Sequence, residues 1–324
     1  MKVGILGTGA YGCSLSKGIV ANKNEVMMWT PFIEEKESIE KTRTIRSLPG
    51  FKLDESIKLT NDLDEIVNFS KLLIVAIPSQ TVDSLFQQLG EKITDDKHIC
   101  ITSKGIEEKT GLFMSEVLRK YSDTKNVAVI SGPSFAIDLV NNNTCGLALA
   151  TKNDETAKIV EKVFENDFLR LRRNEDLIGT EICGSMKNVI AIASGMLDGL
   201  KTSDSTRAML LTEALHDMSK IIVEFNGSER TILSYAGFGD LLLTCNSTKS
   251  RNYSFGKLLG EGKTKEEIEQ YLKNNTVEGY NTLLSIYKLL KENEIKIPMI
   301  NLIHKIVMGK KEPKEILTFL IEKN

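Results

Sequence analysis

The sequence predicts an α/β amino-terminal domain with a doubly wound, mostly parallel sheet, followed by an all-α carboxy-terminal domain. Up to about residue 173, short apolar runs alternate with helix-like segments, which is typical of a sheet covered by helices on both faces. After about residue 175 the apolar residues repeat at helical spacing, without a convincing strand pattern. The length of 324 residues fits two domains. We place them at residues 1–180 and 181–324.

The apolar runs of the first domain are the expected strands. Several are apolar without a break, as strands of a buried parallel sheet are. Helical patterns separate them, for example at residues 112–121 and 155–164. The expected strands are residues 3–6, 26–29, 72–77, 98–102, 127–130, 145–150 and 168–171.

The second domain carries helix start and stop signals. Thr264 and Glu267 have the spacing of a capping box. Gly309, ahead of Pro313, marks the end of a helix. Gly237-Phe-Gly-Asp240 is a poor sequence for a helix interior and predicts a special turn. A helix near residues 175–188 is expected to join the domains, because no linker-like segment separates them.

Composition excludes several classes of protein. Lys and Arg total 42 against 44 Asp and Glu, a net charge of -2, which argues against a nucleic-acid partner but not against a small anionic ligand. The five cysteines form no C-x-x-C pair, so a reducing, cytoplasmic compartment is expected. The three histidines are far apart, so no metal site is expected. No run approaches the ~18 apolar residues of a membrane-spanning helix.

Gly7, Gly9 and Gly12 form a G-x-G-x-x-G pattern directly after the first predicted strand. In this context the pattern is the dinucleotide-binding fingerprint of a Rossmann domain, because the glycines allow a pyrophosphate to reach the amino terminus of the next helix. A tight turn without a ligand is the weaker interpretation. The second strand ends at Thr30-Pro31, with neither the acid typical of NAD enzymes nor the arginine of NADP enzymes. Glu34 and Glu35 come later, so the choice between NAD and NADP stays open.

Two lysines are candidate substrate-binding or catalytic groups. Lys104 lies between an apolar strand and a glycine, where ligands bind in doubly wound folds. Lys187 is the only charge between Glu181 and Asp198, so we expect it to be partly buried. Burial next to another cation lowers the pKa of a lysine toward the range useful for acid–base catalysis. A structural salt bridge is the alternative for Lys187, and a surface charge is the alternative for Lys104.

Arg251 offers a planar group suited to phosphate, with Asn252 beside it as a further donor. Taken alone, Arg251 would more often be a surface residue. With these residues in place, the chain resembles the bacterial NAD(P)-dependent glycerol-3-phosphate dehydrogenases over essentially its whole length. The segments that carry the resemblance are 7–12, 76–79, 103–107, 131–136, 187–193, 198–199, 237–241, 244–245, 250–252 and 277–279.

The resemblance implies reversible reduction of dihydroxyacetone phosphate to sn-glycerol 3-phosphate for phospholipid synthesis, with NAD or NADP, in a homodimer. It implies that Lys187 is catalytic, with Lys104 and Asp240 assisting. The implied substrate-binding residues are Lys104, Gly132, Ser134, Lys187, Asp240, Thr244, Ser250, Arg251 and Asn252. The implied cofactor-binding residues are Gly7, Gly9, Ala10, Tyr11, Gly12, Thr30, Pro78, Lys104, Ala136, Arg251, Thr276 and Glu278.

Three departures from the family pattern accompany the resemblance. Ala10-Tyr11 stands where the family often has Ser-Trp, which leaves the glycines intact. Pro31 stands where the family often has Arg, which weakens the case for a strong NADP preference. Ser203-Asp-Ser205 stands where Gly-Asp-Asn is common.

Two rival functions remain. A β-hydroxyacid dehydrogenase would share the Rossmann domain, the helical domain and a catalytic lysine, but Ser250-Arg-Asn252 and Gly237-Phe-Gly-Asp240 suit a phosphate ester better. A non-catalytic dinucleotide sensor would be expected to have lost its catalytic cations, whereas Lys104, Lys187 and Arg251 are all present.

Overall fold

The computed structural model describes residues 1–322, which divide into two compact units. The first unit comprises residues 1–103 and 114–177. The second comprises residues 104–113 together with the chain from Ile178 onward. The short segment 104–113 therefore leaves the sheet-containing unit and packs with the helices. The domain boundary at residues 180 and 181 stays a prediction.

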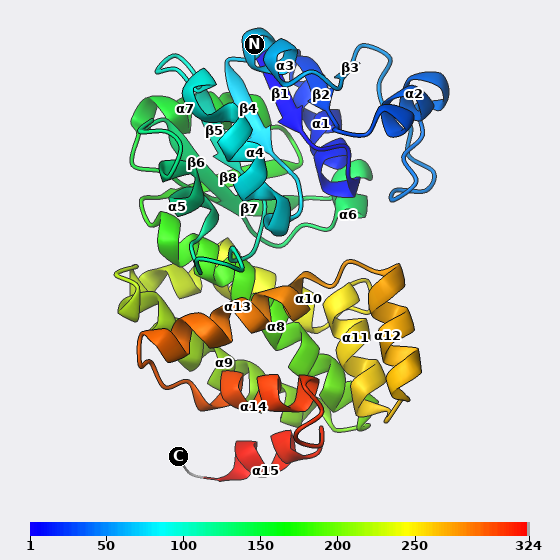
Figure 1. Ribbon diagram of the computed structural model, residues 1–324, viewed down its shortest axis with the longest axis vertical. Helices are drawn as coiled ribbons and strands as arrows, with labels where there is room; N and C mark the ends of the chain where they lie inside the picture. Colours follow the sequence, from blue (N-terminus) through cyan, green and yellow to red (C-terminus); the bar gives the residue numbers. More distant parts are fainter. Residues whose placement is uncertain (323–324) are drawn as a thin grey trace. The chain divides into compact units, whose positions relative to one another are not determined.

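The first unit is built around one eight-stranded sheet (Figure 1). Its strand order is β3-β2-β1-β4-β5-β6-β7-β8, and every neighbouring pair is parallel except β6 with β7. This confirms the doubly wound, mostly parallel sheet. The strands are β1 (Lys2–Leu6), β2 (Glu25–Trp29), β3 (Lys58–Thr60), β4 (Leu72–Val75), β5 (His98–Ile101), β6 (Val127–Ser131), β7 (Cys145–Ala150) and β8 (Leu169–Asn174).

Helices cover both faces of this sheet. Val3 and Ile5 of β1 point into one core with α1 and α7, because alternate residues of a strand face the same side. On the other face, Gly4 lies against Ile66 of α3. The helices of this unit are α1 (Ala10–Ala21), α2 (Ile33–Thr42), α3 (Leu63–Phe69), α4 (Val82–Leu89), α5 (Met114–Arg119), α6 (Ala136–Val140) and α7 (Asp154–Phe164), with 3-10 turns η1 (Ser79–Thr81) and η2 (Gly90–Lys92).

All seven expected strands are present, and the sheet has one more. β3 is only three residues long and reads Lys-Leu-Thr, so it has no apolar run that would reveal it. β8 extends to Asn174 instead of ending at residue 171. It is the last strand of the sheet, and its exposed arginines suit an edge that must not pair with another chain.

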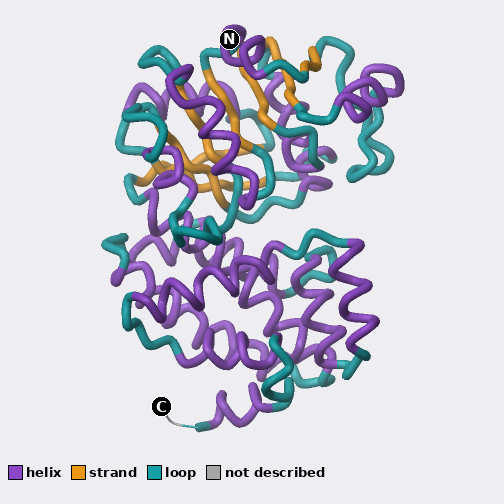
Figure 2. Tube along the Cα trace, in the orientation of Figure 1, coloured by secondary structure: helices purple, strands orange, loops and turns teal. Residues whose placement is uncertain are grey.

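From Ile178 onward the regular elements among the described residues are all helices, and Figure 2 shows no strand there. The segment 104–113 has no helix and contains an isolated antiparallel bridge between Ile106 and Phe113. The predicted capping box is confirmed, because Thr264 and Glu267 each bond the other's backbone N–H. α8 runs through the predicted joining segment. The elements are α8 (Leu177–Gly199), α9 (Asp204–Glu224), η3 (Glu229–Leu233), η4 (Tyr235–Gly239), α10 (Asp240–Cys245), α11 (Arg251–Gly260), α12 (Lys265–Asn274), α13 (Glu278–Glu292), α14 (Pro298–Val307) and α15 (Glu315–Ile321).

Two helices of this unit cross with their backbones in contact. A Cβ atom on Gly195 of α8 would overlap the carbonyl oxygen of Tyr253, and one on Gly256 of α11 would overlap that of Ile192. Only glycine fits at such a crossing. α8 and α11 therefore pack directly against each other in the part of α8 that follows Lys187.

Candidate active site

The glycine-rich turn of the first unit is shaped to leave room for a ligand. Gly7 has φ +123°, and a Cβ there would lie 2.5 Å from the carbonyl oxygen of Ala76. A Cβ on Gly12 would lie 2.7 Å from the oxygen of Gly7. A Cβ on Gly9 would meet open space. The turn therefore needs Gly7 and Gly12 for its own packing, while Gly9 faces the space that a cofactor would fill.

The amino terminus of α1 is suited to a pyrophosphate. Gly9 is its N-cap, so no side chain caps the helix, and the first turn contains no acidic residue. The N–H groups and the positive end of the helix dipole are thus left for an anion. The turn also follows β1, whose neighbours β2 and β4 mark the point where the strand order reverses. This is where dinucleotides bind in open α/β sheets, so the residues present fit NAD or NADP.

The other predicted cofactor positions of this unit follow the ends of strands. Thr30 directly follows β2, Pro78 precedes η1, and Ala136 begins α6. Tyr11 and Ser134 share a hydrogen bond of 3.0 Å between their side-chain oxygens. The departure at Tyr11 therefore anchors a loop that also carries Gly132, which has φ +158°.

In the second unit, Asp240 joins the two predicted lysines. Its Oδ2 accepts a hydrogen bond from Nζ of Lys104 at 2.6 Å, and its Oδ1 accepts one from Nζ of Lys187 at 2.5 Å. Thr244 Oγ1 also donates to Oδ1, at 3.2 Å. The Asp240 side chain is 1% exposed, against 15% for Lys104 and 11% for Lys187. A mostly buried cluster with two cations and one anion retains a local positive charge.

The environment of Lys187 lowers its pKa to about 8. Burial is the main cause, because it disfavours the charged ammonium. Asp240 opposes this shift and Lys104 adds to it. Lys187 therefore changes protonation state near neutral pH, as an acid–base group must.

Glu107, to which the sequence analysis assigned no role, orders the loop that carries Lys104. Glu107, 6% exposed, accepts hydrogen bonds from the backbone N–H groups of Lys109 at 3.1 Å and Thr110 at 2.7 Å. Phe113, at the end of the same segment, packs edge-on against Phe225 with ring centroids 5.8 Å apart. The glutamate of Ser103-Lys-Gly-Ile-Glu107 therefore orders the segment that carries Lys104.

Asp240 is presented by a helix of unusual form. The special turn predicted at Gly237-Phe-Gly-Asp240 is a π-helical turn, η4, which continues directly into α10. The segment is therefore helical, with a widened turn in place of a break. Such turns are often found at functional sites.

Two of the three candidate phosphate-binding side chains already have hydrogen-bond partners within the protein. The Ser250 hydroxyl caps α11 by accepting from the N–H of Tyr253 at 3.3 Å. Asn252, 8% exposed, donates to Oδ1 of Asn188 at 3.0 Å and accepts from the N–H of Gly279 at 2.8 Å. These two side chains therefore also support the helices. Asn188, next to Lys187, is a supporting residue that the sequence did not assign to the site.

Glu278 and Arg251 belong to the same electrostatic environment as the lysines. Burial raises the pKa of Glu278, while the positive charges of Arg251, Lys187 and Lys104 lower it in that order. The Arg251 side chain is exposed, which leaves its guanidinium open to a ligand. Thr276 is also exposed, just ahead of α13.

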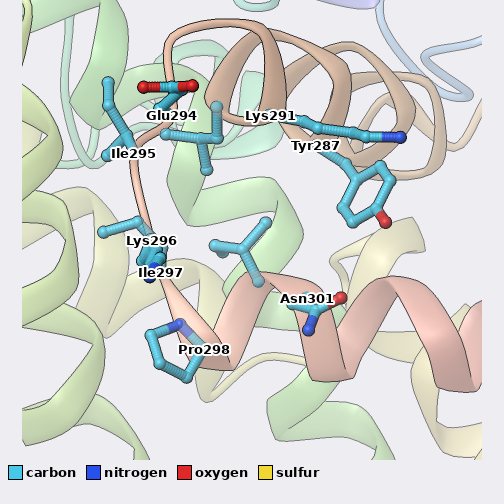
Figure 3. Close-up of a pocket in the computed structure, with 10 residues that line it drawn as sticks. Tyr287, Lys291, Glu294, Ile295, Lys296, Ile297, Pro298 and Asn301 are labelled. Carbon is cyan, nitrogen blue, oxygen red and sulfur yellow. The ribbon is translucent and has the colours of Figure 1, made fainter.

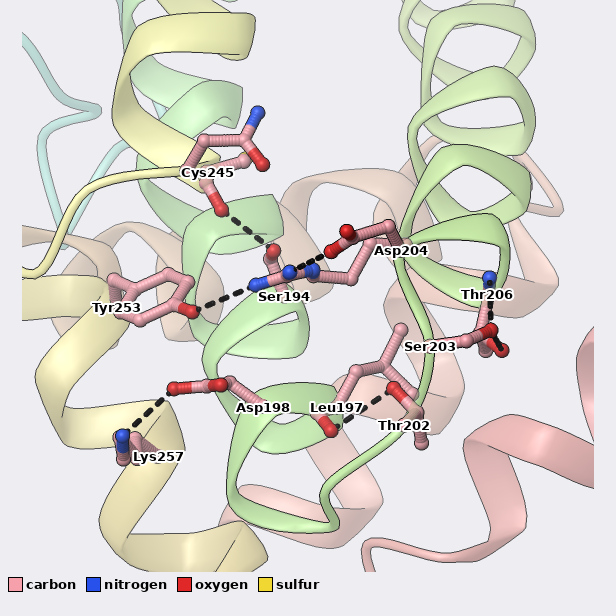
Figure 4. Close-up of polar contacts among 12 residues, drawn as sticks. Ser194, Leu197, Asp198, Thr202, Ser203, Asp204, Thr206, Cys245, Tyr253 and Lys257 are labelled. Atoms are coloured by element: carbon pink, nitrogen blue, oxygen red, sulfur yellow. Dashed lines mark hydrogen bonds and ion pairs between the residues drawn. The ribbon is translucent and has the colours of Figure 1, made fainter.

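Polar contacts bind together the helices that carry these groups (Figure 4). Ser194 of α8 donates to the carbonyl of Cys245 in α10 at 2.7 Å. Asp198 of α8 pairs with Lys257 of α11 at 2.9 Å. These contacts fix α8 against both α10 and α11, and so fix Lys187 relative to Asp240.

The Ser203-Asp-Ser205 departure has a structural role. Ser203 is the N-cap of α9, and its hydroxyl accepts from the N–H of Thr206 at 3.3 Å (Figure 4). Asp204 pairs with Arg207, whose guanidinium also donates to the Tyr253 hydroxyl at 3.2 Å. This segment therefore starts a helix and ties it to α11.

A separate pocket lies near the end of α13 and the start of α14 (Figure 3). Its wall mixes charged groups, such as Lys291 and Glu294, with apolar groups, such as Ile295 and Pro298. It contains none of the predicted site residues. Among the described residues, no group of three or more His, Cys, Asp or Glu could hold a metal ion, and no helix is long and apolar enough to cross a membrane.

Two family matches together cover most of the chain. Residues 2–157 match the NAD-dependent glycerol-3-phosphate dehydrogenase N-terminus, and residues 176–318 match the C-terminus of the same family. The chain belongs to the NAD-dependent glycerol-3-phosphate dehydrogenase family. The resemblance stated from the sequence is confirmed.

Individual relatives agree with this assignment. A glycerol-3-phosphate dehydrogenase [NAD(P)+] of Staphylococcus epidermidis is 33% identical over 310 residues, which are 94% of this chain and 93% of the relative. That of Staphylococcus carnosus is 32% identical over 327 residues, covering 99% and 97%. The crystal structure of glycerol-3-phosphate dehydrogenase from Coxiella burnetii has a TM-score of 0.93 at 30% identity, covering 99% of this chain and 98% of that one.

Proposed function

We propose that this protein is an NAD(P)-dependent glycerol-3-phosphate dehydrogenase that interconverts dihydroxyacetone phosphate and sn-glycerol 3-phosphate. The observation that carries the proposal is the Lys104–Asp240–Lys187 cluster. The chain also has the glycine-rich turn Gly7–Gly12 with the uncapped start of α1, which together we call the dinucleotide cradle. We further propose that the product enters glycerophospholipid synthesis, that the protein is cytoplasmic and that it is a homodimer. Residues 1–180 would bind the cofactor, and residues 181–324 with Lys104 would bind the substrate.

Lys187 is proposed as the proton donor. When bound, the reduced nicotinamide supplies a hydride for C2 of the ketone. The carbonyl oxygen then gains negative charge and takes a proton from the ammonium of Lys187. Lys104 adds positive charge, and Asp240 orients both ammonium groups through its two oxygens. In the reverse direction, neutral Lys187 would accept the hydroxyl proton.

The phosphate of the substrate is proposed to bind at Arg251, with Asn252 and Ser250 as further donors. An arginine presents paired N–H groups that match phosphate oxygens. Binding the phosphate would hold the carbonyl near Lys187 and so lower the entropic part of the barrier. Thr244, which donates to Asp240, would act as a positioning residue.

The test compares two substrates with the purified chain, and the absorbance of the reduced nicotinamide measures each reaction. Dihydroxyacetone phosphate should be reduced with NADH or NADPH, while 3-hydroxyisobutyrate should not be oxidised with NAD or NADP. Faster turnover of the hydroxyacid would favour the β-hydroxyacid dehydrogenase alternative. Cofactor binding without turnover of any phosphorylated ketone would favour a dinucleotide sensor.

A further inference from the structure

The end of β2 is held beside the glycine-rich turn. Leu6 is in register with Trp29, and the N–H of Gly7 donates to the carbonyl oxygen of Trp29 at 2.9 Å. The next residue, Thr30, therefore follows the strand at the position from which Rossmann enzymes contact the adenosine ribose. Its side chain carries no charge, so the discriminating group must come from elsewhere.

Thr30 is a rigid anchor for such a group. It is 1% exposed, its N–H donates to the carbonyl of Thr60 at 3.2 Å, and its carbonyl accepts from the side chain of Asn61 at 2.7 Å. Its hydroxyl donates to Oε2 of Glu35 at 2.6 Å. Glu35 lies in the first turn of α2, and this bond brings its carboxylate back to the end of β2.

The negative charge of Glu35 also acts on a residue of α1, the helix that follows the glycine-rich turn. Burial raises the pKa of Cys13, in the second half of the first turn of α1, and the negative charge of Glu35 raises it further. Among the described residues, no hydrogen-bond partner contacts Oε1 of Glu35. That oxygen is left to accept a bond from a ligand.

Two of the cations in and after α2 are engaged by other groups. Lys36 pairs with Glu40 at 2.8 Å. Arg43 pairs with Glu55 at 3.3 Å and donates to the carbonyl of Ile57 at 2.9 Å. Pro31, directly after Thr30, brings no positive charge to the end of β2 that could pair with a 2′-phosphate. The acidic first turn of α2 also offsets the positive end of its dipole, which would otherwise attract that phosphate.

We propose that Glu35, held by Thr30, accepts hydrogen bonds from the ribose hydroxyls of the adenosine and makes this protein select NAD over NADP. The 2′-phosphate of NADP would replace a hydroxyl donor with a negative charge facing the Glu35 carboxylate. This inference rests on the proposed function and names its cofactor. It assigns to a residue in the first turn of α2 the role that an acid at the strand end usually has.

The test is direct binding of ADP-ribose and 2′-phospho-ADP-ribose to the full chain by isothermal titration calorimetry, without any turnover. The native protein should bind ADP-ribose at least roughly tenfold more tightly, about 1.4 kcal/mol. Glu35→Gln should remove most of this preference, chiefly by strengthening binding of the phosphorylated ligand. Glu34→Gln, which makes the same charge change on the same turn at an exposed side chain, should keep the preference.

The other possible binding results separate failure of the Glu35 inference from failure of the proposed function. Equal affinity of the native protein for both ligands, or an equal effect of Glu34→Gln and Glu35→Gln, would overturn the role of Glu35. Thr30→Val should weaken ADP-ribose binding, and unchanged affinity would overturn the role of its hydroxyl. Failure of the native protein to bind either ligand would instead overturn the proposed function, and the cofactor inference with it.

Discussion

Lys187 and Asp240 lie 53 positions apart in the sequence, and their side chains form a direct ion pair of 2.5 Å between Nζ and Oδ1. The same carboxylate binds Lys104 through its other oxygen. One aspartate thus holds two mostly buried ammonium groups. This arrangement keeps the Lys187 ammonium oriented, while burial lowers its pKa.

The pH dependence of the reaction follows from the lowered pKa of Lys187. Ketone reduction needs the ammonium form, and its fraction falls as the pH rises through about 8. We expect kcat/KM for dihydroxyacetone phosphate to fall about tenfold per pH unit above that value. We expect glycerol 3-phosphate oxidation, which needs the neutral amine, to rise through the same range. A reduction rate that stays level up to pH values near 10 would contradict this role.

The crossing of α8 and α11 should tolerate no side chain. Gly195→Ala would push a methyl group into the Tyr253 carbonyl, so we expect a loss of about 3 kcal/mol in the free energy of unfolding. Gly18→Ala in α1 is the control, because its Cβ would come no closer than 3.2 Å to the Asn166 side chain. Urea unfolding monitored by circular dichroism compares the two. Similar stability of both variants would show that the crossing is not tight.

Arg251 should matter for the phosphorylated substrate more than for the cofactor. Arg251→Ala removes the proposed phosphate-binding group from an exposed position, so the fold should be retained. We expect KM for dihydroxyacetone phosphate to rise about tenfold or more, in line with the loss of a charge-assisted hydrogen bond. The steady-state kinetics of Arg230→Ala, at another exposed arginine of this unit, serve as the comparison. An unchanged KM in Arg251→Ala would remove its role.

Much of the fold could be predicted from the sequence, because buried parallel strands have apolar runs and amphipathic helices have a clear period. β3 escaped prediction because three residues with one apolar side chain carry no such signal. The π-helical turn before Asp240 escaped for another reason. Glycines indicate unusual backbone geometry but not its type.

The site was predicted only as separate residues. Lys104 and Asp240 are 136 positions apart, and no spacing rule indicates that they form an ion pair. Glu107 and Asn188 support the site through bonds to backbone and amide groups, which the sequence alone does not reveal. The contact between Thr30 and Glu35 depends on the direction in which α2 leaves the sheet, so Glu35 could not be placed beforehand.

The most direct test of the central claim is the turnover number for dihydroxyacetone phosphate reduction by Lys187→Ala at saturating cofactor and substrate. ADP-ribose binding and thermal unfolding, measured on the same sample, show that the cradle and the fold are intact. Lys311→Ala, at an ion-paired lysine just ahead of α15 that contacts none of the site residues, is the control and should keep near-native turnover. We predict that Lys187→Ala binds ADP-ribose normally and loses at least about 99% of turnover, within the range that general acid catalysis contributes. Near-native turnover in that variant would contradict the account.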